Sequence, residues 1–474
     1  MTPALLPAVV AGWIRFLAWL AFLAVCFGVF ATAPNRLVGW RPLLWILIAA
    51  PAFAFTARLG LRGGLRPLFR MAWLENHSAR IVLWSVSGGF LLRTLFVLMA
   101  PPVQLSDFNE YVGLANNLLD TGQYFSHTEN GTVWYAYRPP GYAAFLAGWI
   151  WVFGKSPWLP AISNLLLYVG TALLLDRMAR RWAGAAPAAL AQLLFAVWPS
   201  HIAMTGLAHY EPLLAFLMML SWWLFLDQEC PGCWAAAGLI TGFSVLVRQI
   251  LLPAPFFWLL HRAIRPGSRS RALLAVALAS VALYAVVLPW AARNRGKGLS
   301  AMVATNGGQA LYQGANDDAT ADYNDVPSVN MQRKMNWNEE RADIEMAALA
   351  RQWIAANPEK WISLMLAKQA YFLGEDTSGF YWSLRMPYNT GGAVYAGLQG
   401  IAHLWWIGVW FLATLAAVAQ RDLLRNSSAL QFFLWMIVFF VVAAAPFTIQ
   451  PRYHMPFVPL ALVIAGLAVR PLPE

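Results

Sequence analysis

The sequence predicts an all-α membrane protein that crosses the bilayer many times. Of the 474 residues, 59% are hydrophobic and only 12% are charged, a balance that excludes a soluble globular domain of this size. A bilayer-spanning helix needs about 20 mainly apolar residues, and such runs recur from one end of the chain to the other. Basic clusters separate several of these runs, as they do on the cytoplasmic side of membrane proteins.

We expect about twelve spans, within a range of about eleven to thirteen. The apolar runs lie near residues 8–33, 40–57, 80–100, 158–176, 183–199, 210–228, 232–248, 250–264, 271–290, 395–419, 428–447 and 453–470. The first run is too long for the core of a signal peptide and is expected to be a retained helix. A further run, residues 141–153, is too short to span upright and is either re-entrant or a tilted crossing. If it crosses, residues 232–264 cross once rather than twice.

The placement of the charges predicts the topology. The net charge is +11, residues 58–80 hold five arginines against one acid, and residues 261–271 read HRAIRPGSRSR. Under the positive-inside rule these clusters are cytoplasmic. We therefore expect a bacterial inner (plasma) membrane protein with both termini in the cytoplasm. The same clusters explain the positive charge without nucleic acid as a partner.

Three cysteines are too few for a disulfide framework. Cys26 lies inside an apolar run, where cysteine behaves as a small hydrophobic residue. Cys230 and Cys233 have the spacing of a metal-ligand or redox pair, but no second pair or histidine lies near them in the sequence. We interpret them as ordinary residues.

Two polar segments interrupt the apolar pattern, and the crossing count places both on the outer side. Residues 291–376 carry nine Lys or Arg and eleven Asp or Glu, which is typical of a translocated segment. The two outer loops are therefore the expected active site. The regions that we expect are two extra N-terminal helices with a basic cytoplasmic loop (1–79), a membrane core containing the first outer loop at 101–140 (80–290), a second outer loop with interfacial helices (291–394) and C-terminal spans (395–474).

Asp107, Glu110 and Tyr111 in the first outer loop lie at helical spacing, so one helix face carries all three side chains. This face suits a ligand. The alternative is a capping box, in which an N-terminal Asp and a Glu three residues later bond free backbone N–H groups. Capping and catalysis do not exclude each other.

The first outer loop ends with Tyr137 and Arg138 before a double proline. This places a guanidinium group at the rim of the membrane. It either binds a phosphate bidentately or extends to lipid headgroups.

Polar residues inside apolar spans are costly unless they line a cavity or find partners. His209 and Glu211 start one span, and Arg248 separates two others. At the outer ends of their helices they would surround a pocket. Extension of Arg248 to the headgroups is the alternative.

The second outer loop and the last span add further candidates. Arg293 lies just outside the bilayer and precedes a stretch rich in Gly and Asn that contains Asn306 and Asn316. Positive charge suits an anionic headgroup, and amide side chains suit a polyhydroxylated ligand, although loops also use Asn for turns. Arg452 and Tyr453 open the last span on the same outer side.

In this order and spacing, four segments resemble the GT-C superfamily of membrane glycosyltransferases, specifically the branch of bacterial aminoarabinose transferases and protein O-mannosyltransferases. The resemblance covers residues 80–470. The segments that carry it are Asp107 with Tyr111, then Tyr137-Arg138-Pro139-Pro140-Gly141-Tyr142, then Leu288-Pro289-Trp290 with Arg293-Asn294 and Asn306-Gly307-Gly308, and finally Arg452-Tyr453.

The resemblance implies roles for the charged residues. Asp107 takes the position of the general base, and Arg138 takes that of the basic residue associated with the donor phosphate. Arg293 and Arg452 flank the lipid-phosphate site. Tyr137 stands where the family has an acid, so a metal contact made by that acid is in doubt. No cofactor is expected, and a divalent metal is not indicated.

The implied activity is an inverting transfer of a sugar from a polyprenyl-monophosphate donor to a hydroxyl of a glycan, lipid or protein on the outer face. One alternative is a polysaccharide polymerase or ligase that uses a pyrophosphate-linked oligosaccharide. Another is a secondary transporter, but transporters place substrates near the bilayer midplane and often show internal repeats, whereas the polar residues here cluster on one side.

Overall fold

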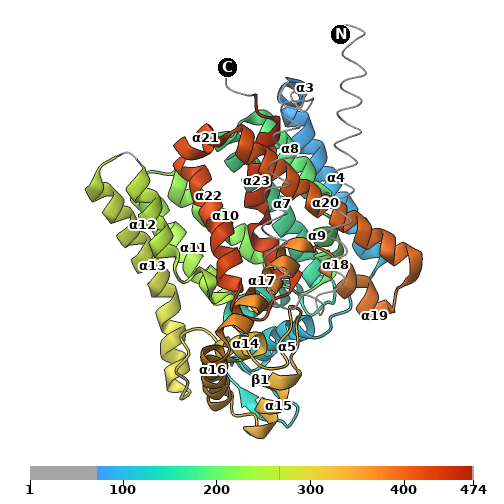
Figure 1. Ribbon diagram of the computed structural model, residues 1–474, viewed down its shortest axis with the longest axis vertical. Helices are drawn as coiled ribbons and strands as arrows, with labels where there is room; N and C mark the ends of the chain where they lie inside the picture. Colours follow the sequence, from blue (N-terminus) through green and yellow to red (C-terminus); the bar gives the residue numbers. More distant parts are fainter. Residues whose placement is uncertain (1–71, 266, 472–474) are drawn as a thin grey trace.

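The computed structural model describes residues 72–265 and 267–471 (Figure 1). The spans expected at 8–33 and 40–57, most of the region 1–79, and Cys26 lie outside this part of the chain. The described chain is helical apart from one short antiparallel hairpin, in which Ser126 faces Trp134 and His127 faces Val133. An all-α membrane fold is therefore confirmed.

The first half of the described chain contains α3 Ala72–Asn76, α4 Ser78–Met99, α5 Asp107–Thr121, β1 Ser126–His127, β2 Val133–Trp134, α6 Pro140–Phe153, α7 Leu159–Trp182, α8 Ala185–Ala196, α9 Pro199–Ala203, η3 Met204–Gly206, α10 Glu211–Asp227, α11 Pro231–Val247, η4 Gln249–Leu251 and α12 Ala254–Ile264. Proline stands in the first turn of α6, α7, α10 and α11, where its missing N–H costs no helical bond.

The second half contains α13 Arg269–Gly296, α14 Gly307–Gly314, α15 Val326–Lys334, α16 Glu339–Ala356, α17 Pro358–Gly374, α18 Ser378–Phe380, η5 Tyr381–Arg385, α19 Met386–Tyr388, α20 Gly392–Ala419, α21 Arg421–Asn426, α22 Ser428–Ala444, η6 Pro451–Phe457, α23 Val458–Gly466 and η7 Leu467–Val469. The segment η5 is a π-helix.

Five of the described helices are long and apolar enough to cross a membrane: α4, α7, α13, α20 and the continuous segment Pro451–Val469. A sixth is added if α8 and Pro199–Gly206, which are bent by 48°, form one broken span. The count of about twelve is therefore not confirmed. Several expected spans form helices shorter than about 20 residues; α10 and α11 have 17 residues each and α12 has 11.

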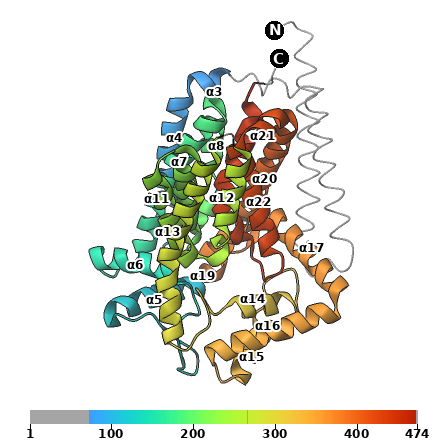
Figure 2. The same ribbon diagram turned by 90° about the vertical axis from the view of Figure 1, so that its left-hand side faces the viewer.

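The bundle has two distinct ends (Figure 2). We call the end that carries α5 and α14 to α16 the loop end, because both polar segments lie there. Backbone bonds join the segments, since Thr305 N–H donates to the carbonyl of Ala136 at 2.9 Å. The short apolar helix α6 packs against α5 at the same end.

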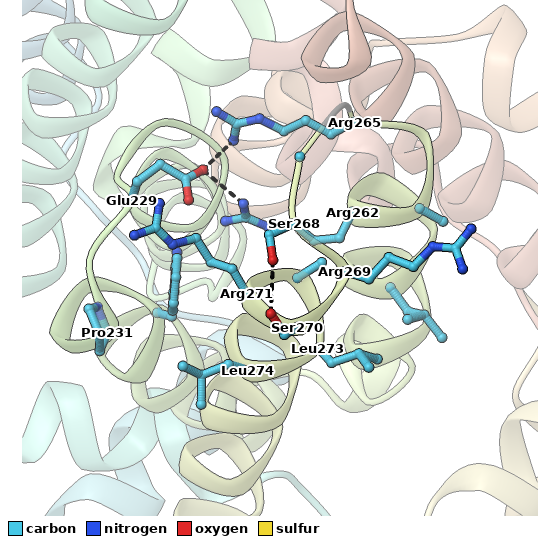
Figure 3. A pocket seen from close by; sticks show the side chains of 15 residues that line it. Glu229, Pro231, Arg262, Arg265, Ser268, Arg269, Ser270, Arg271, Leu273 and Leu274 are labelled. Carbon is cyan, nitrogen blue, oxygen red and sulfur yellow. Dashed lines mark hydrogen bonds and ion pairs between the residues drawn. The ribbon is translucent and has the colours of Figure 1, made fainter.

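The turns between α10 and α11 and between α12 and α13 lie at the opposite end (Figures 1 and 3). The basic stretch 261–271 is therefore separated from the outer loops by the length of α13. There Glu229 accepts a hydrogen bond from Arg262 at 2.8 Å and forms an ion pair with Arg265 at 2.7 Å. The charge pattern assigns the basic stretch and the two polar loops to opposite sides of the membrane. The structure likewise places them at opposite ends of the bundle.

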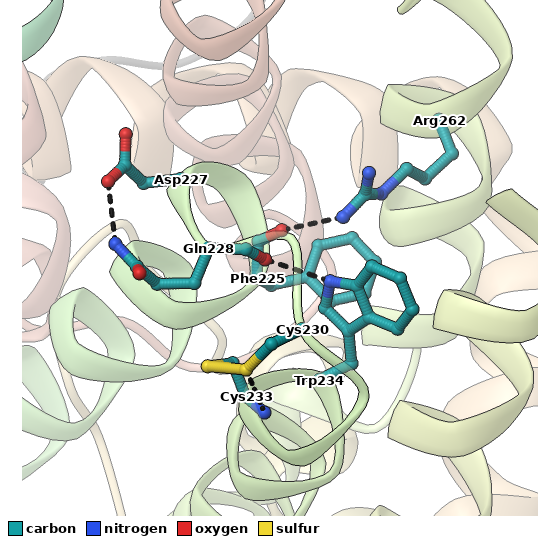
Figure 4. The surroundings of a disulfide bond; sticks show 7 residues. All are labelled: Phe225, Asp227, Gln228, Cys230, Cys233, Trp234 and Arg262. Carbon is teal, nitrogen blue, oxygen red and sulfur yellow. Dashed lines mark hydrogen bonds between the residues drawn. A yellow bond between two sulfur atoms is a disulfide. The ribbon is translucent and has the colours of Figure 1, made fainter. Parts of the chain in front are cut away.

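Cys230 and Cys233 form a disulfide at this opposite end (Figure 4). The interpretation of the pair as ordinary residues was wrong. Cys230 is the N-cap of α11 and Cys233 lies in its first turn, which brings their Cα atoms to 5.2 Å, within the range that a disulfide requires. One turn of helix therefore supplies the geometry of the bond.

A buried arginine joins α4 to the bent pair α8 and α9. Arg93 donates to the carbonyls of Gly89, Ala196 and Phe195 at 2.9, 2.8 and 3.1 Å, and its Nε–H donates to His201 at 3.2 Å. A charge in a span is costly unless its donors are satisfied. Arg93 meets that condition by taking the carbonyls at the break between the two helices.

Glycine permits the close approach of α11 and α13. A Cβ atom at Gly238 would lie 2.1 Å from the carbonyl oxygen of Ala279, and one at Gly242 would lie 2.6 Å from that of Leu283. Small residues at helix contacts let the backbones approach, which is a main source of packing energy between helices in lipid.

We expect Gly238→Ala to lower the thermal unfolding midpoint of the purified protein, because the added methyl group must push α11 away from α13. Overpacking of this kind costs about 1–3 kcal/mol. Gly408→Ala is the matched control, since a Cβ there meets nothing within 4 Å. An equal effect of the two substitutions would contradict the close packing of α11 on α13.

Candidate active site

Asp107 is held between two arginines that come from distant parts of the chain. Arg138 Nη2 donates to its Oδ1 at 2.7 Å, and Arg452 Nη2 donates to its Oδ2 at 2.6 Å. Arg138 directly precedes the double proline before α6, and Arg452 lies in η6, in the last span. Three separate segments therefore meet at one carboxylate.

The capping interpretation of Asp107 is wrong. Ser106, not Asp107, is the N-cap of α5, and its side chain makes no capping bond. Both carboxylate oxygens of Asp107 instead accept from guanidinium groups. Ser106 also has a positive φ of 51°, which is uncommon for a residue other than glycine and costs about 1–3 kcal/mol where the surroundings enforce it. The backbone is thus strained directly before the candidate base.

Arg138 lies inside the site and does not extend to the headgroups. Its Nε–H donates to Glu110 at 2.8 Å, and its side chain is 16% exposed. The Tyr124 hydroxyl donates to the carbonyls of Arg138 and Pro139 at 2.9 and 3.1 Å. A Cβ atom at Gly141 would lie 2.6 Å from the backbone nitrogen of Val247, so only glycine allows this close contact. These contacts fix the direction of the guanidinium group.

Arg452 is almost fully buried, with 3% of its side chain exposed. Its guanidinium carbon lies 5.1 Å from the centre of the Phe108 ring and 5.6 Å from that of Trp382. Trp382 belongs to the π-helix η5, a rare conformation that recurs at functional sites. The sequence carries no signal for this residue, since a single Trp in a long loop has no pattern.

His209 and Glu211 form a buried pair next to Arg452. His209 Nδ1 and Glu211 Oε2 are 3.0 Å apart, and Glu211 Oε1 lies 3.9 Å from Arg452 Nε. Within the described chain, neither Glu211 Oε1 nor Arg452 Nε has a hydrogen-bond partner, and the hydroxyl of Tyr142 has none either. Buried polar atoms are usually paired, so these atoms mark a place for a polar group of a ligand or for water.

Arg248 faces the same region from the end of α11. Its guanidinium carbon lies 5.2 Å from the ring centre of Tyr210 and 5.3 Å from that of Tyr453. The cation is therefore positioned between two aromatic rings, an arrangement that stabilises it. The contacts favour the pocket over the headgroup alternative for Arg248.

Burial and charge act in opposite directions on Asp107. Burial alone would raise the pKa of its carboxyl, but Arg138 and Arg452 outweigh burial and hold the pKa well below its usual range. Burial raises the pKa of Tyr137 to about 12 and that of Tyr111 further above its usual value. Asp107 is thus ionised and both phenols are protonated at neutral pH.

Tyr111 and Tyr137 form part of the wall of the site. The Tyr111 ring packs edge-on against Tyr142 at 5.1 Å, and the ring of Tyr137 lies 5.0 Å from the guanidinium carbon of Arg138. Tyr137 also packs on Trp134 at 4.5 Å. An aromatic ring therefore borders Arg138 at the position where the family that the sequence resembles has an acid.

Arg293 holds the first outer loop rather than the carboxylate cluster. It donates to the carbonyls of Tyr135 and Tyr124 at 2.6 Å each, and it lies 4.4 Å from the ring centre of Trp290. It makes no ion pair with any residue that the structure describes. Its position supports the loop that carries Arg138, and both of its terminal nitrogens donate to backbone carbonyls of that loop.

The two predicted asparagines lie in turns. Asn306 precedes α14 and makes no capping bond with its side chain. Asn316 donates to the carbonyl of Tyr312 at 2.7 Å and accepts from the N–H of Asp318 at 2.7 Å. Asn316 therefore stabilises its own turn, and neither asparagine contacts the Asp107 cluster.

Glu339, at the start of α16, is a residue that the sequence did not single out. Its Oε2 accepts from the N–H of Tyr135 at 2.6 Å, and its Oε1 accepts from the N–H of Ala136 at 2.7 Å. The Thr305 hydroxyl also donates to Oε1, at 2.6 Å. These bonds connect the two outer loops two residues before Arg138. No local pattern could reveal a contact between residues so far apart in the sequence.

Among the residues with a described position, no three His, Cys, Asp or Glu side chains gather as a metal-binding group. The charges of the cluster balance instead. Asp107, Glu110 and Glu211 supply three carboxylates, and Arg138, Arg248 and Arg452 supply three guanidinium groups.

The described chain shares its fold with solved polytopic membrane proteins. No protein-family model and no curated protein matches the sequence. Among solved structures, the oligosaccharyltransferase AglB of Archaeoglobus fulgidus, in complex with an inhibitory peptide and a dolichol-phosphate, matches with a TM-score of 0.52 at 14% identity. The match covers 84% of this chain and 50% of that chain, so this chain spans about half the length of the archaeal enzyme.

Two further structures extend the comparison. The apo form of the same archaeal oligosaccharyltransferase matches with a TM-score of 0.51 at 14% identity over 84% of this chain and 51% of that chain. ArnT of Cupriavidus metallidurans, bound to undecaprenyl phosphate, matches with a TM-score of 0.38 at 15% identity over 82% and 77% of the two chains. The two archaeal structures, with TM-scores above 0.5, share the fold of this chain, as the resemblance implied.

We expect Glu339→Gln to loosen the segment 133–138, because the substitution weakens three hydrogen bonds and removes their charge. Backbone amides of this segment should exchange faster with deuterium than in the wild type. Glu345→Gln is the control, since Glu345 is an exposed acid on the same helix α16. Unchanged protection of residues 133–138 in Glu339→Gln would contradict the role of Glu339.

Proposed function

We propose that this protein is an inverting glycosyltransferase that moves a sugar from a polyprenyl-monophosphate donor to a hydroxyl group of a glycan, lipid or protein. The observation that carries the proposal is the Asp107 carboxylate between Arg138 and Arg452 at the loop end of a GT-C fold. A carboxylate is a suitable general base, and arginines bind phosphate.

The orientation is part of the proposal. The basic stretch 261–271 lies at the opposite end from Asp107, and basic clusters stay in the cytoplasm. The loop end then faces the periplasm from a bacterial inner membrane, with both termini cytoplasmic. The archaeal structure of the same fold, which holds a dolichol-phosphate, supports a polyprenyl phosphate as the lipid that this site binds.

The reaction is a single displacement. Asp107 accepts the proton of the acceptor hydroxyl while that oxygen attacks the anomeric carbon of the sugar. The bond between this carbon and the phosphate oxygen breaks, and its electrons leave with the polyprenyl phosphate. Arg138 and Arg452 stabilise the charge that develops on the leaving group. Base catalysis of this kind typically contributes ~10²- to 10⁴-fold, and fixed charges often contribute as much.

The bonds of Asp107 suggest how the base is activated. Both of its oxygens accept from guanidinium groups, which lowers its pKa and makes it a weak base. A donor phosphate offers Arg138 and Arg452 a second anion. When the phosphate draws either arginine away, the pKa of Asp107 rises and the carboxylate becomes a stronger base. Donor binding therefore precedes removal of the acceptor proton.

We expect Asp107→Asn to abolish transfer while the protein still accumulates in the membrane. Mass spectrometry of envelope glycolipids, glycans and glycoproteins from a deletion strain identifies the missing sugar, and complementation then compares the variants. Wild-type protein should restore the sugar, and Asp107→Asn should not. Near-normal restoration by this variant would overturn the assignment of the base.

Glu110→Gln is the matched control, because Glu110 lies on the same helix face and also bonds Arg138. It should retain most of the transfer. A larger loss of transfer in this variant than in Asp107→Asn would identify Glu110, one helical turn further on, as the base.

The donor is tested separately. In membrane vesicles, a pyrophosphate-linked sugar supplied in place of the monophosphate-linked one should give no product. Transfer from the pyrophosphate alone would favour the polymerase or ligase alternative.

The activation of Asp107 by the donor predicts two different pH profiles once the sugar is known. Activity requires ionised Asp107, so it is lost as pH falls through the pKa of this group. For the donor, kcat/KM reports the free enzyme and should stay level down to about pH 4. For the acceptor at saturating donor, kcat/KM reports the donor complex and should fall at a higher pH. If the two pH profiles coincide, an arginine does not move from Asp107 to the donor phosphate when the donor binds.

A further inference from the structure

A cavity of about 1170 Å³ lies at the opposite end of the bundle from Asp107. The turn before α11 and the turn between α12 and α13 surround it (Figure 3). Arg269 and Arg293 stand near the two ends of α13, and at 1.5 Å per residue this separation is roughly 36 Å. The cavity is therefore distinct from the candidate active site.

Four arginines and one acid line the cavity. Glu229 accepts a hydrogen bond from Arg262 and forms an ion pair with Arg265. The same two arginines donate to the carbonyls of Phe225 and Leu226 at 3.0 Å each. These bonds hold two guanidinium groups in fixed positions. Arg262 has 5% of its side chain exposed, and its Nε–H has no hydrogen-bond partner in the described chain.

The remaining two arginines, Arg269 and Arg271, are exposed. They make no ion pair with any described residue. Figure 3 shows the Arg271 side chain extending toward Glu229 and the Arg269 side chain pointing the opposite way. The cavity therefore carries a net charge of +3, from four arginines and Glu229. This arrangement is complementary to a phosphate group.

The start of α13 adds to this positive potential. Ser268 is its N-cap but makes no capping bond with its side chain, so it leaves backbone N–H groups of the first turn available. The N-terminus of a helix carries a positive partial charge of about half a unit and binds phosphates. The residues of this first turn and the four arginines line the same cavity.

The outer wall of the cavity is apolar. Leu259, Leu273 and Leu274 line it and are 46%, 60% and 48% exposed. Exposed leucines beside fixed cations suit an amphipathic ligand, whose charged group enters the cavity while its hydrocarbon lies along the helices. A free phosphate ion would use the cations but leave the leucines uncovered.

We propose that this cavity binds the phosphodiester headgroup of an anionic phospholipid from the leaflet opposite the active site. The phosphate lies against Arg262, Arg271 and the start of α13, where Arg269 adds further positive charge, and the acyl chains lie along the three leucines. Charge bias for topology requires only basic residues near the ends of spans. It does not require fixed guanidinium groups, a cavity and an apolar wall together.

Native mass spectrometry of the purified full chain tests the proposal, with phosphatidylglycerol and phosphatidylcholine as the probes. Phosphatidylglycerol should bind the wild type selectively. Each basic residue near a membrane contributes about 1 kcal/mol to the binding of anionic lipid, so Arg269→Gln with Arg271→Gln should weaken binding by roughly tenfold or more. If the double variant does not accumulate, the single substitution Arg271→Gln replaces it, and we expect it to weaken phosphatidylglycerol binding about fivefold.

Arg421→Gln with Arg425→Gln is the matched control, because these two exposed arginines lie in α21, at the same end of the bundle but outside the cavity. The control should keep the wild-type affinity. Equal losses in both double variants, or no loss in either, would overturn the proposal. Binding of inorganic phosphate as tight as that of phosphatidylglycerol would also overturn it, since the site would then recognise a free anion.

Discussion

The Asp107 carboxylate accepts hydrogen bonds from Arg138 and Arg452, and the loop end of the structure is arranged around this contact. Burying a charge is costly unless it is paired with good geometry. Here Arg452 comes from the last span and Arg138 from the loop before α6. Removal of Asp107 would leave Arg452 with only the more distant Glu211, at 3.9 Å, and Arg138 with only Glu110. The contact therefore both fixes the path of the chain and defines the site.

The outer loops hold these charges in place through backbone bonds. Glu339 accepts from two amides of the first loop, and Arg293 donates to two of its carbonyls. Glu339 from α16 and Arg293 from α13 thus both bond the backbone of the first loop. The position of Arg138 therefore depends on residues that touch no substrate in the proposed reaction.

The sequence predicted the helical membrane fold and the three residues Asp107, Arg138 and Arg452, because apolar run length, charge bias and motif order are local signals. It did not predict Glu339 or Trp382, whose roles depend on contacts between distant segments. It left two roles open for Asp107, a helix cap and a catalytic base, because the spacing of residues alone cannot show where a carboxylate points. The Cys230–Cys233 disulfide was missed because the sequence pattern favoured unlinked residues.

The short helices α10, α11 and α12 have a consequence for the surrounding lipid. The 11 residues of α12 rise about 16 Å, roughly half the hydrocarbon thickness of a bilayer. Helices shorter than the bilayer are accommodated by local thinning of the membrane or by tilting. Thinning along this flank would shorten the vertical distance between the lipid headgroups and the protein interior. It would thereby ease the entry of the proposed polyprenyl-phosphate donor from the side.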